Sequence, residues 1–349
     1  MRKIVISILF VVISVSLMAQ ETKKETKEKP KNYKVFGNIY TGFYYTFNDN
    51  YTPRSAFEFS TGLLGYRHKI SEKITATLIY DVTRTTNNIK VSDSIGNSFN
   101  VTYFEGSKYT AFLKMGEIDW NITDYLQLSV GQLLNQQYLT VQDKWWGYRY
   151  IAVSYQEKYR YGMPADFGSR LTYKGNLLKY SITVTNGEGP FRHQDDGSKF
   201  LVASNIEITP VDGLMIKMYN DYEPAPSSGV GIADKNVNSF FVGYKKNKIM
   251  AGLEYNEIRN YGYMQNENVY GISLYGSYKI TDKFDVLARA DYGNLYPQYD
   301  NNAKLIDNKQ YYIAGLQYQP EKNLFTSVNF RYTNPEDIPQ VYANFGIKF

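Results

Sequence analysis

Hydrophobic and polar residues alternate along most of the chain from about residue 33 to its end. The stretch 178–185 is a clear example, with Leu178, Tyr180, Ile182 and Val184 alternating with Lys179, Ser181, Thr183 and Thr185. Successive side chains of a β-strand point to opposite faces of the sheet, so a period of two predicts strands with one apolar and one polar face. We therefore predict an all-β protein.

Sixteen segments carry this pattern, and most have about the ten residues that a tilted strand needs to cross a membrane. They are 33–47, 56–70, 73–84, 109–122, 124–136, 165–175, 177–186, 199–210, 212–222, 237–246, 248–257, 268–280, 282–293, 309–319, 322–332 and 339–349. Short turns alternate with longer loops between them, as in outer-membrane barrels, whereas a soluble sandwich has no reason to sort its connections. The sequence predicts a transmembrane antiparallel up-and-down β-barrel of about 16 strands with both termini in the periplasm.

Two irregularities interrupt the pattern. Residues 88–104 alternate weakly around Ile95-Gly96-Asn97, which indicates a hairpin inside the loop 85–108. Slips of the period near 63–66 and 115–118 predict β-bulges.

The last segment is apolar on one parity up to the terminal Phe349. An exposed strand edge of this kind is a liability in water, and in lipid an open edge leaves backbone groups unsatisfied. We therefore expect the last strand to pair with the first and close the barrel. The alternative is the ordinary edge strand of a sandwich.

Composition supports a membrane barrel. The chain has 35 Tyr, 16% aromatic residues and no Cys, and its mean hydropathy of −0.45 excludes a helical membrane bundle. Tyrosine suits the two interfaces of a bilayer, where one end of the ring is apolar and the other wet. Without Cys there are no disulfides, thiol catalysis or thiolate metal sites.

The N-terminus reads as a secretory signal. Arg2 and Lys3 precede an apolar run that ends near Ala19, which predicts a signal peptide at 1–19. The Lys- and Glu-rich stretch 20–32 predicts a flexible periplasmic leader, and 33–349 is the barrel. Charges in the barrel region balance, so net charge gives no reason to expect a nucleic-acid partner.

A barrel of about 16–18 strands is wide enough to leave an aqueous channel. Arg or Lys on the lipid face near the bilayer midplane would cost about 2–4 kcal/mol each, so such residues should face inward. The predicted lumen-facing charged residues are Arg170, Lys179, Lys217, Asp285, Arg289, Asp291 and Arg331.

The long connection 137–164 contains two of the chain's three Trp. A loop with this many aromatic residues would form an exposed apolar patch if it lay outside the barrel. We therefore expect it to fold inward and narrow the lumen. The predicted constriction residues are Lys144, Trp145, Trp146, Arg149, Lys158 and Arg160, whose excess of positive charge predicts mild anion preference. The alternative is a packed loop whose charges pair locally.

Three local runs carry a family resemblance: KWWGYRY at 144–150, ADFG at 165–168 and VTNGEG at 184–189. They resemble uncharacterised porins of the Bacteroidetes-type outer membrane and, more distantly, the phosphate-selective porin O and P family. The resemblance implies a sixteen-stranded porin with an inward-folded third extracellular loop and no cofactor. It also implies that assembly machinery reads Phe349. Phosphate selectivity is not implied, because the predicted inner charges alternate in sign.

These patterns predict a non-enzymatic outer-membrane porin for passive diffusion of small hydrophilic solutes or ions. Lipid, lipopolysaccharide, the assembly machinery and two further copies in a homotrimer are its expected partners. A non-conducting structural or partner-binding barrel is the alternative, and an outer-membrane hydrolase is a weaker one. His68 and His193 have no metal partner at useful spacing, so we expect no metal site.

Overall fold

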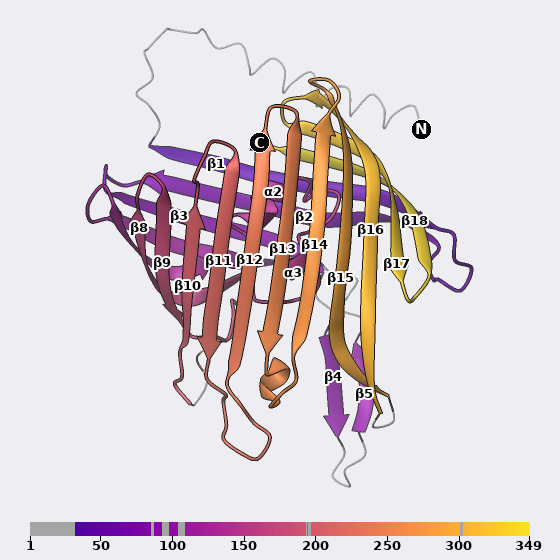
Figure 1. Ribbon diagram of the computed structural model, residues 1–349, viewed down its shortest axis with the longest axis horizontal. Helices are drawn as coiled ribbons and strands as arrows, with labels where there is room; N and C mark the ends of the chain where they lie inside the picture. Colours follow the sequence, from indigo (N-terminus) through magenta and orange to yellow (C-terminus); the bar gives the residue numbers. More distant parts are fainter. Residues whose placement is uncertain are drawn as a thin grey trace, which may run out of the picture. The chain divides into compact units, whose positions relative to one another are not determined.

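A computed structural model describes residues 32–84, 87–92, 98–103, 109–192, 194, 197–300 and 303–349 (Figure 1). The predicted signal peptide at 1–19 and residues 20–31 of the predicted leader lie outside this part of the chain. Within it, no helix combines the length and apolar character needed to cross a membrane.

Sixteen antiparallel strands form one closed barrel, which confirms the predicted fold class and strand number. They are β1 (Tyr33–Thr46), β2 (Ser55–Lys69), β3 (Ile74–Arg84), β6 (Tyr109–Asn121), β7 (Leu126–Leu134), β8 (Ala165–Lys174), β9 (Leu178–Thr185), β10 (Leu201–Ile208), β11 (Leu214–Glu223), β12 (Lys235–Lys246), β13 (Ile249–Arg259), β14 (Val269–Lys279), β15 (Phe284–Asp300), β16 (Ala303–Glu321), β17 (Leu324–Asn334) and β18 (Ile338–Lys348). Each strand pairs with its neighbour along the chain, except that β3 pairs directly with β6.

The strands skipped by the barrel, β4 (Asn87–Ser92) and β5 (Ser98–Tyr103), form a separate two-stranded sheet. This is the hairpin predicted within the loop 85–108.

The last strand closes the barrel as predicted. β18 pairs with β1 from Asn38 opposite Lys348 to Thr46 opposite Gln340. Gly37 and Phe349 then exchange two backbone hydrogen bonds of 3.0 Å each. The terminal residue therefore leaves no open edge, which satisfies the requirement that lipid imposes on backbone groups.

Two strands are longer than predicted. We expected strands at 282–293 and 309–319, whereas β15 reaches Asp300 and β16 begins at Ala303. The two strands stay paired beyond the predicted ends, with one register shift between Leu295 and Gln298. Pro297 lies in that shift, where a residue without a backbone N–H can be tolerated, and this Asn- and Pro-containing stretch had indicated a loop.

Register shifts also occur near the predicted bulges. One lies between Tyr40 and Thr41 opposite β2, a few residues from the predicted slip at 63–66. The other lies opposite Ile79 and Tyr80, between Leu113 and Met115 of β6, just before the predicted slip at 115–118. Because of the second shift, the side chain of Lys114 points into the barrel, where it pairs with Asp81.

Candidate functional site

The wall of the barrel has two chemically different faces. On β9, the side chains of Ile182 and Val184 are 44% and 38% exposed on the outer face, whereas Ser181 and Thr185 on the inner face are 0% and 6% exposed. The same division recurs from strand to strand because paired residues share a face. The outside is apolar, as a lipid-facing wall requires.

The structure places all seven predicted lumen-facing residues on the inner face of their strands. They are Arg170 on β8, Lys179 on β9, Lys217 on β11, Asp285, Arg289 and Asp291 on β15, and Arg331 on β17.

Residues 135–164, here called the inserted segment, connect β7 to β8 and contain two short helices, α2 (Gln142–Trp146) and α3 (Tyr155–Lys158). The segment lies inside the barrel, because it bonds to inner-face side chains of several strands (Figure 1).

Three inner-face cations hold this segment by its backbone. Lys217, Arg289 and Arg331 are 1%, 3% and 8% exposed. The bonds run from Lys217 Nζ to Gln136 O and Gln137 O (both 2.6 Å), from Arg289 Nη1 to Val153 O (2.6 Å) and from Arg331 Nη2 to Ile151 O (2.7 Å). Hydrogen bonds from charged donors are among the stronger ones in proteins, so these cations fix the path of the segment.

Aromatic residues of the segment pack on the same wall. Ring-centroid distances are 5.8 Å for Trp145–Phe241, 5.3 Å for Trp146–Tyr275 and 5.8 Å for Tyr150–Phe325. The indole N–H of Trp145 donates to Ala251 O at 3.0 Å. The aromatic loop is thus covered by the barrel rather than exposed outside it.

Beneath the segment, part of the inner face of the barrel is apolar. Five inner-face positions on β12 to β16 are buried and apolar or aromatic: Phe241, Met250, Tyr275, Leu287 and Ile313. They form one cluster with Trp146, Tyr148 and Tyr150 of the segment. Apolar residues on the polar parity of five consecutive strands were the sequence signal for this contact.

Tyr155 of α3 fits into a gap made by two glycines. A Cβ atom added to Gly271 of β14 would lie 1.5 Å from the Tyr155 hydroxyl oxygen, and one on Gly293 of β15 would lie 2.3 Å from it. Tyr155 itself is fully buried. The wall is therefore shaped to receive this ring, and no other residue type than glycine leaves enough room.

The charges at the centre of the segment pair locally. Arg149 donates to Asp143 Oδ1 at 2.8 Å and bonds to both carboxylate oxygens of Glu157. Burial would raise the pKa of Glu157, but the Arg149 charge outweighs it and holds that pKa below its ordinary value of 4.5. The pair is therefore ionised at neutral pH.

The six predicted constriction residues occupy different environments. Trp145 and Trp146 pack on the wall, and Arg149 is paired. Lys158 Nζ lies 2.7 Å from the ring centroid of Tyr311 on β16. Only Lys144 and Arg160 of this set are exposed.

The wall formed by β3 to β10 carries three ion pairs between inner-face side chains. Lys114 contacts Asp81 at 2.6 Å, Arg170 contacts Glu117, and Lys179 contacts Glu207 at 3.1 Å. Sequence analysis missed Lys114, because the register shift in β6 reverses the parity on which it would otherwise lie. By strand order this charged wall faces the strands that hold the inserted segment.

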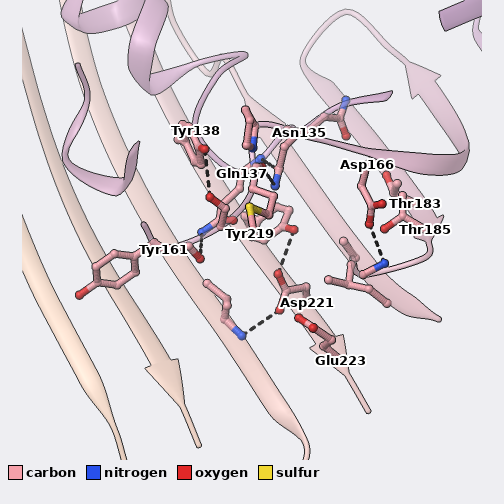
Figure 2. A pocket seen from close by; sticks show the side chains of 18 of the residues that line it. Asn135, Gln137, Tyr138, Tyr161, Asp166, Thr183, Thr185, Tyr219, Asp221 and Glu223 are labelled. Carbon is pink, nitrogen blue, oxygen red and sulfur yellow. Dashed lines mark hydrogen bonds between the residues drawn. The ribbon is translucent and has the colours of Figure 1, made fainter. Parts of the chain in front are cut away.

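A cavity of about 540 Å³ lies between the two ends of the segment and the wall from β8 to β13. Figure 2 shows Asp166, Thr183 and Thr185 on one side, with Tyr219, Asp221 and Glu223 on another. Two hydrogen bonds between cavity-lining residues join the two ends of the segment. Tyr138 Oη donates to Gly162 O at 3.1 Å, and Gln137 Nε2 donates to Tyr161 O at 3.1 Å. Within the described residues, no group of three His, Asp or Glu side chains could hold a metal ion.

No protein-family model matches the chain, and no curated protein matches it. Solved outer-membrane structures share its fold. OmpF of Salmonella typhi in complex with daunomycin is 11% identical, with a TM-score of 0.64 over 91% of this chain and 97% of that one. OmpT of Vibrio cholerae is 12% identical, with a TM-score of 0.60 over 92% and 99%. A mutant of the Rh. blastica porin is 12% identical, with a TM-score of 0.57 over 91% and 100%. The chain therefore has the barrel fold of outer-membrane porins.

Proposed function

We propose that this protein is an outer-membrane porin through which small hydrophilic solutes or ions diffuse passively. It has no catalytic residues and needs no cofactor in this proposal. The observation that carries it is the division of the interior: the inserted segment is bonded to β11, β15 and β17, while paired charges line β3 to β10. A water-filled passage between the segment and the charged wall accounts for both.

In this proposal the inserted segment is the constriction. Trp145 and Trp146 anchor it, Arg149 and Lys158 stabilise it, and Lys144 and Arg160 are its accessible charges. Because both accessible charges are positive, the channel is mildly anion-preferring. The residues Arg170, Lys179, Lys217, Asp285, Arg289, Asp291 and Arg331 belong to the lumen wall.

We also propose how the protein is exported and assembled in the outer membrane. Residues 1–19 are a signal peptide and 20–32 a periplasmic leader, so both termini lie in the periplasm. Assembly machinery reads Phe349, and the mature barrel is a homotrimer surrounded by lipid and lipopolysaccharide. Some fold neighbours support the trimer, since an in-vitro folded OmpT of Vibrio cholerae is described in a trimer form. The runs at 144–150, 165–168 and 184–189 support membership of the Bacteroidetes-type porins.

Planar-bilayer recording of the purified protein tests the proposal. We expect open, ohmic single-channel currents and a reversal potential on the anion-preferring side in a salt gradient. A barrel that inserts, as judged by heat-modifiable electrophoretic mobility, but passes no current would refute it. That result would favour the non-conducting barrel, for which the buried aromatic packing of the segment is the supporting observation.

A further inference from the structure

The cavity between the inserted segment and β8 to β13 has a composition that the channel function does not require. Its carboxylates lie on more than one wall: Glu157 in the inserted segment, Asp166 on β8, Glu188 after β9, and Asp221 and Glu223 on β11. Its volume of about 540 Å³ falls in the range of small-molecule sites, roughly 300–1,000 Å³.

Two of these carboxylates, Asp221 and Asp166, are held in fixed positions by neutral donors. Asp221 accepts the hydroxyl proton of Tyr219 at 3.0 Å and the backbone N–H of Val237 at 3.0 Å. Asp166 accepts the backbone N–H of Gly187 at 2.6 Å and that of Phe167 at 2.8 Å, and Thr185 and Gly189 also donate to it. A carboxylate has about four lone-pair sites, so Asp221 retains capacity to accept from a solute, whereas the sites of Asp166 are already used.

The cavity is lined by both acidic and basic side chains. Lys235 forms an ion pair with Glu223, and Arg160, Arg170 and Arg192 also line the cavity. An anionic solute would meet the carboxylates and a cationic one would meet Lys235 and Arg160, at a cost in both cases. A hydroxyl group both donates and accepts, so a neutral polyhydroxylated solute suits both kinds of wall.

Apolar surface completes the lining. Tyr261 and Tyr263 stand at the loop end of the cavity, and Val237 and Ile258 lie further along the wall (Figure 2 shows the polar part). Aromatic and aliphatic surface matches the C–H faces of a sugar ring, while a few placed polar groups fix its orientation.

We infer that this cavity is a binding subsite for an uncharged saccharide of mono- or disaccharide size, encountered before the constriction. This inference rests on the proposed channel function and names a preferred solute class. The binding groups are Asp221 and Thr183, and Asp166 is a fixed part of the cavity wall.

Maltose is the probe, in two assays: block of the ion current in bilayers and calorimetric titration of the detergent-solubilised barrel. We expect saturable binding. Asp221→Asn should raise the half-saturating maltose concentration about tenfold, because it replaces one accepting carboxyl oxygen by an NH2 group that only donates. Thr183→Val, which is nearly isosteric and guards against misfolding of the first variant, should weaken it about fivefold. Asp212→Asn is the matched control, since Asp212 is exposed at a short turn and pairs with Lys246.

Glucosamine and glucose 6-phosphate separate the solute classes. Binding of either charged sugar more tightly than glucose would overturn the inference, and so would equal maltose binding by all variants. A barrel that conducts normally but binds no maltose refutes this inference alone. Failure to conduct refutes the channel function, and calorimetry then decides the saccharide site by itself.

Discussion

Replacing Gly271 by alanine should dislodge the inserted segment from the barrel wall. The new Cβ would lie 1.5 Å from the hydroxyl oxygen of Tyr155, 2.2 Å from its Cζ and 2.8 Å from its Cε1. Carbon atoms pack at about 3.5–4.0 Å, so the ring must retreat by roughly 2 Å. Overpacking of a close-packed site costs about 1–3 kcal/mol, and this overlap is severe enough to approach the upper value. Retreat of α3 from the wall relieves that cost.

Two readouts follow the displacement. The single-channel current should become noisier and change in amplitude, and trypsin should cut the segment at its Lys and Arg residues. Gly116→Ala is the control, because its Cβ would make only ordinary contacts at 3.5 Å. The double variant Gly271→Ala/Tyr155→Ala should regain quiet currents, a non-additive result expected of residues in contact. If Gly271→Ala retains wild-type current noise and trypsin resistance, the proposed seating of Tyr155 is wrong.

Three further predictions concern the charges. Lys217→Met should increase trypsin cleavage of the segment, because it removes three bonds from a buried cation, each worth about 1.5–3 kcal/mol; unchanged protection in limited proteolysis would contradict this. The Arg149–Glu157 pair should survive from pH 8 to 5 and be lost only as pH falls through the pKa of Glu157, which lies below its ordinary value of 4.5, so current noise should rise only in that acidic range; a midpoint near 6 in a pH series would exclude it. Lys144→Glu combined with Arg160→Glu should shift the reversal potential toward cation preference, and an unaltered potential would remove both residues from the selectivity determinants.

Periodicity alone was sufficient for the wall. Most of the barrel strands carry a clear period of two, and this period predicted their number and the closed antiparallel barrel. Alternation fails where the backbone departs from regular pairing. The shift between Leu113 and Met115 reversed the parity of Lys114, and pairing beyond Asn294 extended β15 into an apparent loop.

The interior of the barrel was harder to predict. Positions such as Phe241 and Leu287 break the polar parity, and their significance appears only when consecutive strands are aligned in register. The saccharide cavity depends on side chains from separate strands and from both ends of the segment, so sequence spacing carries no signal for it. Gly271 shows the same limit, since only the position of Tyr155 explains why it has no side chain.

Lys217, Arg289 and Arg331 donate hydrogen bonds to main-chain carbonyl oxygens, which every amino acid possesses. The bonds from Arg331 and Arg289 therefore fix the backbone at Ile151 and Val153 without depending on the side chains there, and the side chain of Ile151 is constrained separately by the buried cluster. The same barrel could then carry constrictions of different composition in the same place, and new permeation properties could evolve there while the scaffold stays unaltered.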